Sequence, residues 1–196
     1  LDLAAAMWAL LSLYWFLEGR WGLASAAATA LVLTKETGLI VPLALAVFSR
    51  GNPKRVLVLL VPPVAALGSW LLYLHATTGH WLGSAEFARY NVGEALDLWR
   101  PPLVLLRRLY QLGFANFHWI ATVLVALAVI RHGALRDGRW RLPAAVGAGY
   151  VALHSLLGGA ILLRYLLPAI ALFYAATAAA LEAVRPTLRR GGLALL

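Results

Sequence analysis

Seven apolar segments divide this chain and constrain its fold more than any other feature. A bilayer core about 30 Å thick needs roughly 20 apolar residues per crossing helix, and runs close to that length recur throughout. Hydrophobic residues make up 62% of the chain and charged residues 13%, which excludes an ordinary soluble domain. The sequence predicts an all-α, polytopic membrane protein with about seven membrane helices in a single transmembrane domain, residues 1–196. The apolar segments are residues 3–17, 21–34, 38–48, 56–74, 114–130, 143–163 and 165–184.

The second and third segments are too short to cross a bilayer alone, since at 1.5 Å per residue they measure only about 21 and 17 Å. They form either one long helix with Lys35 and Glu36 at its middle or a hairpin of two short helices. The three strongest basic blocks lie at residues 50–55, 131–141 and 185–190. Because basic residues gather in cytoplasmic loops, the hairpin puts Arg20 inside and Asp2 outside, whereas one long helix leaves a charged pair at mid-bilayer. The charge pattern therefore favours the hairpin.

The net charge of +9 is mostly explained by this topology. In a soluble protein 17 Lys and Arg against 8 Asp and Glu would suggest a nucleic-acid partner, but here the cations lie in short blocks between apolar runs. We therefore expect membrane lipids as partners and no nucleic acid. The chain has no cysteine, which excludes a thiolate metal site, and the irregular spacing of His75, His80 and His118 does not match a zinc site.

The stretch from His75 to Gly113 is more polar than the rest of the chain and predicts an extracytoplasmic interfacial loop. Its aromatic residues are typical of a membrane boundary: Trp81, Phe87, Tyr90, Trp99 and Tyr110. Pro101 and Pro102 mark a break, and residues 103–112 predict a helix that lies along the membrane surface. A solvated face of this helix accounts for Arg107 and Arg108.

Lys35 carries a positive charge at a depth in the membrane where burying a charge is costly. The short helices on either side would hold its ammonium near the outer headgroup level, where a lipid-linked phosphate also lies. Charges at such depth are functional candidates by default. The alternatives are that Glu36 neutralises Lys35 or that Lys35 reaches out to lipid phosphates in general.

Arg164 and Tyr165 lie between the last two apolar segments, on the side that the charge pattern assigns to the outside. An arginine there opposes the positive-inside bias, and its planar guanidinium suits a phosphate or a carboxylate. The alternatives are a headgroup anchor or an ion pair with Glu36 or Asp2.

Two further residues complete the candidate binding set. Arg89 is interleaved with aromatic residues, which suits a phosphate beside a prenyl chain or a sugar but is also typical of any interfacial helix. Asp2 begins the first segment on the outer side, where a carboxylate helps to bind a metal or an acceptor, or caps the helix. The predicted substrate-binding residues are Lys35, Arg89, Arg164, Tyr165, Glu36 and Asp2, with no metal ligand.

Three short motifs, in this order, resemble the membrane glycosyltransferases of the GT-C class. The closest resemblance is to the bacterial relatives of protein O-mannosyltransferases and aminoarabinose transferases, which are glycosyltransferase family 39-like. The motifs are an aspartate at the outer start of a span, a short helix ending in Leu-Thr-Lys with a proline after it, and Arg-Tyr-Leu-x-Pro. They fall on Asp2, Leu33-Thr34-Lys35 with Pro42, and Arg164-Tyr165-Leu166-Leu167-Pro168.

This resemblance implies a function. The family transfers a sugar, with inversion, from a polyprenyl-phosphate carrier to an acceptor at the outer face of the membrane. It implies that Lys35 contacts the lipid phosphate and that Arg89, or else Arg100, is a second phosphate ligand, while Arg164 matches the terminal arginine motif. No cofactor is assigned, although a divalent metal is compatible with the family. The implied location is the bacterial inner membrane, with the active site on the extracytoplasmic side.

The chain departs from the family in one respect. The acidic catalytic motif of the family lies upstream of the segment that corresponds to Asp2, so we expect a fragment that holds the carrier-binding part without the general base. Such a fragment would not transfer sugar alone, and no catalytic residue is assigned. Two other classes remain open: a transporter or flippase for a lipid-linked or anionic solute, and an inert structural membrane subunit.

Overall fold

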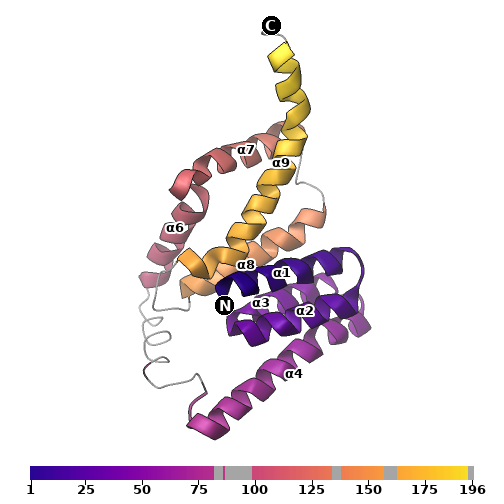
Figure 1. Cartoon of the computed structure of the whole chain (residues 1–196), viewed down its shortest axis with the longest axis vertical. Helices are drawn as coiled ribbons and strands as arrows, with labels where there is room; N and C mark the ends of the chain where they lie inside the picture. Colours follow the sequence, from indigo (N-terminus) through magenta and orange to yellow (C-terminus); the bar gives the residue numbers. More distant parts are fainter. Residues whose placement is uncertain (82–85, 87–98, 134–137, 157–162, 194–196) are drawn as a thin grey trace.

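The computed structural model describes residues 1–81, 86, 99–133, 138–156 and 163–193, with the backbone alone at 132 and 185–193. The described residues are all-helical, which confirms the predicted fold class, and each of the seven apolar segments contains a helix (Figure 1). The α-helices are α1 Asp2–Leu17, α2 Trp21–Thr34, α3 Ile40–Phe48, α4 Pro53–Thr78, α6 Arg100–Gly113, α7 His118–His132, α8 Arg141–Leu156 and α9 Leu167–Leu193. Short 3-10 helices join some of them: η1 Glu36–Leu39, η3 Ala115–Phe117, η4 Gly138–Trp140 and η5 Leu163–Leu166.

The prediction of about seven membrane-crossing helices is wrong. Within the described residues, only α4 and the stretch Leu163–Val184 are long and apolar enough to cross a membrane. A third crossing results if Arg100–Gly113 and Ala115–Arg131, which meet at a bend of 50°, form one broken span. The helices α1, α2 and α8 have 16, 14 and 16 residues, and α3 has 9, so each is shorter than the roughly 20 residues that a crossing requires.

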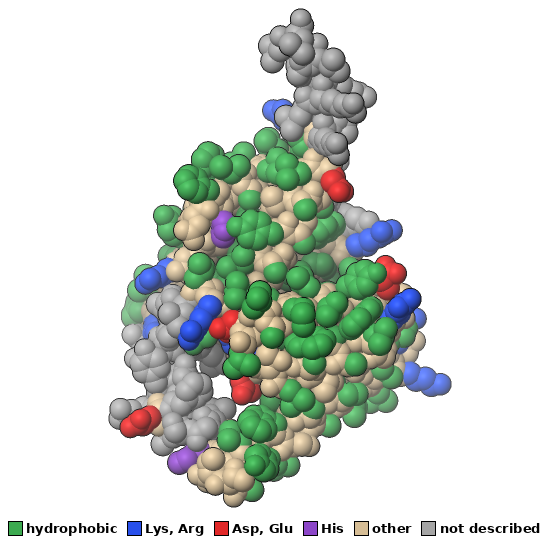
Figure 2. Space-filling view, in the orientation of Figure 1, with side chains coloured by type: hydrophobic (Ala, Val, Ile, Leu, Met, Phe, Trp, Pro, Cys, Tyr) green, Lys and Arg blue, Asp and Glu red, His purple; other side chains and the backbone are tan. Residues whose placement is uncertain are grey.

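The outer surface of the molecule is strongly apolar. Figure 2 shows hydrophobic side chains over most of the face in view, with charged groups in small numbers. Large side chains that a soluble protein would bury are exposed, for example Leu72 and Tyr73 on α4, each at 61%. Exposed apolar surface of this extent marks contact with a membrane or another protein. This property and the two to three long apolar helices agree with a membrane location.

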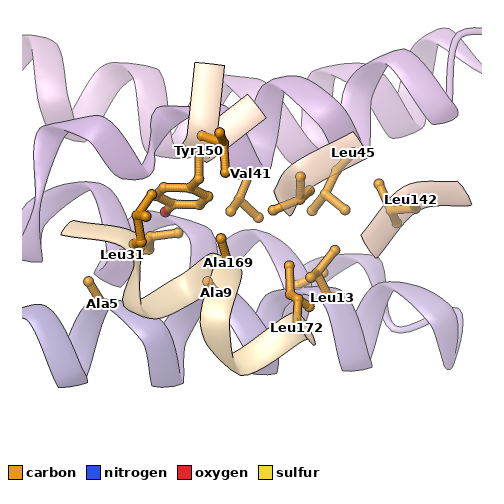
Figure 3. Packing of buried hydrophobic residues seen from close by; sticks show 14 of the residues in the cluster. Ala5, Ala9, Leu13, Leu31, Val41, Leu45, Leu142, Tyr150, Ala169 and Leu172 are labelled. Atoms are coloured by element: carbon orange, nitrogen blue, oxygen red, sulfur yellow. The ribbon is translucent and has the colours of Figure 1, made fainter. Parts of the chain in front are cut away.

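One apolar core is built mainly from α1, α2, α3, α8 and α9 (Figure 3). Small residues at the contact of α1 with α2 let the two backbones approach closely, as is usual for helices packed in membranes. At this contact the Ser12 hydroxyl donates a hydrogen bond of 2.9 Å to the carbonyl of Ala24. The fully buried large side chains of the core include Leu31, Leu45, Leu142 and Tyr150. This core fixes the ends of the helices relative to one another.

The predicted hairpin of the second and third segments is confirmed. The helix α2 stops at Thr34 because the backbone of Lys35 is extended, with φ −158° and ψ 121°. The chain then returns along α3, so that Arg55 at the start of α4 lies 4.0 Å over the ring of Trp21 at the start of α2. Lys35 therefore lies at one end of α2 and Arg20 at the other, as the charge pattern predicts.

The turn after Lys35 depends on Gly38. A Cβ atom at Gly38 would lie 2.5 Å from Cγ of Leu31, a side chain that is itself completely buried. The missing side chain thus lets η1 pack directly onto the last turn of α2. Lys35 lies between these two elements, at the turn that this close contact forms.

Gly38→Ala is expected to lower the free energy of unfolding by about 1–3 kcal/mol, because the added methyl group must displace the buried Leu31. The matched control is Gly68→Ala in α4, where a Cβ atom meets nothing within 4 Å. Removing a helical glycine should raise stability by about 0.5–1 kcal/mol there. Unfolding in mixed detergent micelles measures both variants, and equal effects of the two substitutions would contradict the proposed role of Gly38.

The stretch 75–113 differs in part from its prediction. The helix α4 continues to Thr78, so His75 lies within it, whereas residues 82–85 and 87–98 lie outside the described residues. The predicted helix at 103–112 is confirmed as α6, which begins at Arg100 with prolines in its first turn. After α6 the backbone takes positive φ values at Asn116 and Phe117, which produces the bend before α7.

Candidate functional site

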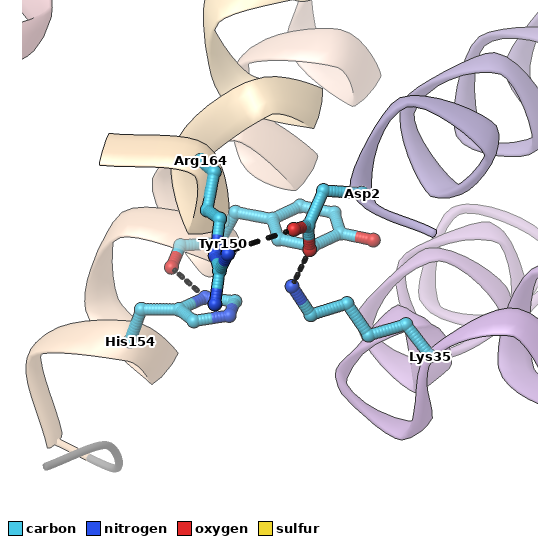
Figure 4. Close-up of polar contacts among 5 residues, drawn as sticks. All are labelled: Asp2, Lys35, Tyr150, His154 and Arg164. Atoms are coloured by element: carbon cyan, nitrogen blue, oxygen red, sulfur yellow. Dashed lines mark hydrogen bonds and ion pairs between the residues drawn. The ribbon is translucent and has the colours of Figure 1, made fainter. Parts of the chain in front are cut away.

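Asp2, Lys35 and Arg164 meet at one end of the helix bundle, although they come from α1, the α2–η1 turn and η5 (Figure 4). Oδ1 of Asp2 accepts a short hydrogen bond from the Lys35 ammonium, and Nε of Arg164 lies 3.5 Å from Oδ2. The Lys35 and Asp2 side chains are 19% and 23% exposed, whereas Arg164 is 62% exposed. The Asp2 carboxylate thus bridges the two cations. We call these three residues, Asp2, Lys35 and Arg164, the rim of the site.

These contacts show which of the predicted ion pairs form. Lys35 pairs with Asp2, whereas the neighbouring Glu36 is exposed and begins η1. Arg164 also pairs with Asp2, which was one of its two predicted ion-pair partners. Asp2 does not cap α1 through its side chain, since α1 has no side-chain cap hydrogen bond. Arg89 lies outside the described residues.

Tyr165 is the shared aromatic surface of the site. The Lys35 ammonium lies 4.2 Å from the centre of the Tyr165 ring, and the Arg164 guanidinium carbon lies 5.6 Å from it. The ring of His154 stacks on Tyr165 with a centroid distance of 5.8 Å and an interplanar angle of 25°. Cations over an aromatic face are stabilised by about 0.5–2 kcal/mol, so Tyr165 helps to hold both cations in place.

Arg108 is a further residue of the site, and its assignment to a solvated helix face is wrong. Its side chain is completely buried, and none of its three guanidinium nitrogens has a hydrogen-bond partner among the described residues. It lies on α6, which packs against α8, the helix of His154, and against η5, which carries Arg164 and Tyr165. A buried arginine stays charged and needs a partner, so this guanidinium is expected to bind an anion.

Several neutral polar atoms on α6 and α8 are also buried without a partner within the described residues. The Nδ1–H of His154 donates a hydrogen bond of 2.9 Å to the Tyr150 carbonyl, whereas its Nε2 atom is buried and finds no partner in the part of the chain that the structure describes. The same holds for the Tyr150 hydroxyl and for Oε1 of Gln111, one turn after Arg108 on α6. An unsatisfied buried polar group costs about 1–3 kcal/mol. This arrangement is suited to a polar ligand that satisfies these atoms.

Taken together, Lys35, Arg164 and Asp2 are in contact with one another, and Arg108 is buried on α6, which packs against η5 and α8 beside them. The excess of positive charge, the partly enclosed position and the aromatic surface suit a phosphate group on an apolar carrier. An incoming phosphate would compete with Asp2 for Lys35 and Arg164. Within the described residues no group of three or more His, Cys, Asp or Glu side chains is placed to hold a metal ion.

Comparisons with protein-family models, with curated proteins and with solved structures give no match to this chain. The resemblance to the GT-C class therefore stays a prediction that depends on three short motifs. The structure brings residues of all three motifs together at Asp2, Lys35 and Arg164.

Proposed function

We propose that this chain is the carrier-binding part of a GT-C-like membrane glycosyltransferase. The enzyme would transfer a sugar from a polyprenyl-phosphate donor to an acceptor at the extracytoplasmic face of a bacterial inner membrane. The observation that carries the proposal is the convergence of Lys35 and Arg164 on Asp2 beside Tyr165. Residues that are distant in sequence form one cationic site next to strongly apolar helices, which is what a lipid-linked phosphate requires.

The chemistry of transfer fits such a site. When the glycosidic bond breaks, the electron pair goes to the phosphate oxygen, and the carrier phosphate gains negative charge in the transition state. Fixed cations whose contacts strengthen at that moment accelerate the reaction. Lys35, Arg108 and Arg164 would supply this stabilisation. The acceptor hydroxyl needs a carboxylate base, which the proposal places upstream of Asp2.

Asp2 has a defined part in this proposal. Its carboxylate pairs with Lys35 and Arg164, and the carrier phosphate takes over these contacts when it binds. Because Asp2 already interacts with two cations, we do not propose it as the base. Its role is to hold Lys35 and Arg164 near each other and to be displaced by substrate.

A transporter or flippase for a lipid-linked anion is the second candidate. The observation that favours it is the break between α6 and α7, where the helix pair bends by 50°. Broken helices near a binding site are frequent in transporters. The same cationic site would then bind the phosphate during translocation without any bond being broken.

The complete protein in membrane vesicles, given a radiolabelled polyprenyl-phosphate sugar, is expected to release free polyprenyl phosphate and to label an acceptor. Matched vesicles without the protein are the control. Movement of the labelled lipid between leaflets without transfer would favour the transporter. Absence of both transfer and movement, together with absence of binding to this chain, would contradict both candidates.

A further inference from the structure

A second set of cations lies at the end of the bundle opposite Asp2. Arg20 precedes α2, Arg50 follows α3, and Lys54 and Arg55 begin α4, and all four side chains are exposed. Among the described residues that connect the helices here, Glu18, directly after α1, is acidic. This end of the molecule therefore carries a net positive charge.

The same end opens into an apolar groove between α2 and α4. The groove has a volume of about 570 Å³ and almost no polar surface. Its walls are small residues of α2 and larger residues of α4: Gly22, Ser25, Ala26, Leu57, Val58, Val61 and Pro62. All of these lie within the first three turns of their helices, so the groove begins beside the cations.

The geometry at the mouth links the groove to the cations. The two helices start at the same end, because the Arg55 guanidinium lies 4.0 Å over the Trp21 ring. The exposed fractions of Leu57 and Val61 are 60% and 53%, so the α4 wall is open to the surroundings. Since α4 is apolar enough to cross a membrane, lipid is the environment that this wall faces. Tryptophan and arginine together are typical of the membrane boundary.

We propose that this groove binds one acyl chain of an anionic phospholipid, with the headgroup phosphate contacting Arg20 and Arg55. The apolar groove matches the acyl chain of such a lipid, and the cations at its mouth match the headgroup. Each lysine or arginine near a membrane surface raises the affinity for anionic lipid about fivefold. Small side chains on α2 leave room for the acyl chain. This site is separate from the Asp2 site and does not depend on the proposed function.

The test is retention of lipid by the reconstituted chain. The protein is placed in nanodiscs of equal phosphatidylglycerol and phosphatidylcholine, released into mild detergent, and its bound lipids are counted by native mass spectrometry. Wild-type protein is expected to retain phosphatidylglycerol in preference to phosphatidylcholine. Ala26→Leu, which fills the groove, should abolish this preference. The matched control is Ala65→Leu, an exposed position of α4 outside the groove, which should keep it.

A charge variant tests the headgroup separately. Arg55→Gln should lower phosphatidylglycerol retention about fivefold, whereas Arg141→Gln, an exposed arginine at the start of α8, should leave it unchanged. A wild-type protein without headgroup preference, or Ala26→Leu protein that retains lipid like the wild type, would overturn the proposal. Polyprenyl-phosphate binding at Lys35 should persist in Ala26→Leu. The proposed phospholipid site can therefore be disproved without affecting the proposed function.

Discussion

Arg108→Met is expected to stabilise the protein measured without ligand and, at the same time, to weaken its proposed binding of polyprenyl phosphate. Burial of the Arg108 guanidinium costs desolvation free energy, and no hydrogen bond from the described residues offsets this cost. Methionine fills a similar volume without charge. Removing one uncompensated buried charge should raise the free energy of unfolding by about 3 kcal/mol.

The same substitution should weaken ligand binding although it raises stability, because the ligand phosphate is the proposed hydrogen-bond partner of Arg108. A hydrogen bond between a charged donor and an anion contributes about 1.5–3 kcal/mol, so Arg108→Met should weaken binding at least about tenfold. Titration of the reconstituted chain with a fluorescent polyprenyl phosphate measures the affinity, and unfolding in detergent micelles measures the stability.

Arg107→Met is the matched control, since Arg107 is the adjacent residue on the same helix but is exposed. It should change neither stability nor affinity by more than a small amount. If Arg108→Met lowered stability and left affinity unchanged, Arg108 would be a structural residue and its place in the site would be wrong.

The helices themselves could be predicted from the sequence. Each apolar segment became helical because its side chains need an apolar environment and its backbone must satisfy its own hydrogen bonds there. The number of crossings could not be predicted in the same way. Composition reports how apolar a segment is, whereas crossing depends on the length of unbroken helix. In the segment 114–130, positive φ values at Asn116 and Phe117 interrupt the helix and leave α7 with 15 residues.

The face that α6 buries explains why Arg108 was not predicted as a residue of the site. A helix that lies along the membrane surface is expected to place its arginines in water, and this expectation assigned Arg108 to a solvated face. In α6 the buried positions are Val104 and Arg108, one turn apart, while Leu103 and Leu106 are 65% and 64% exposed. A signal was present in the sequence, because Val104, Arg108 and Gln111 share a narrow helix face opposite those leucines.

The three residues at the rim of the site could be predicted from the sequence, unlike Arg108. Alternating helix direction placed Asp2, Lys35 and Arg164 at one end, and the structure brings all three into contact. The partner of Lys35 was not determined by the sequence. Glu36 is its neighbour in the chain but lies in the 3-10 turn, whereas Asp2 comes from the start of α1. Which carboxylate pairs with Lys35 depends on how α1 packs against α2.

Lys35→Ala is expected to reduce sugar transfer by the complete protein about a hundredfold, as for the loss of one group that stabilises transition-state charge. Binding of polyprenyl phosphate to this chain should fall about tenfold, through the loss of a charge-assisted contact. Membrane insertion should be unchanged, because Lys35 lies at the rim of the bundle, outside its apolar core. Arg141→Ala, which removes an exposed cation elsewhere, is the control for net charge.

Asp2→Asn separates a binding role of Lys35 from a purely structural one. If Lys35 only holds α1 through Asp2, both substitutions break the same ion pair and both should weaken polyprenyl-phosphate binding. If Lys35 binds the phosphate, Asp2 competes with the ligand, and Asp2→Asn should release Lys35 and Arg164. Two partly exposed ion pairs are worth roughly 1–2 kcal/mol together, so Asp2→Asn should then strengthen binding about tenfold while Lys35→Ala weakens it. Opposite signs in the two affinities therefore support the phosphate site, and a loss of affinity in both variants would contradict it.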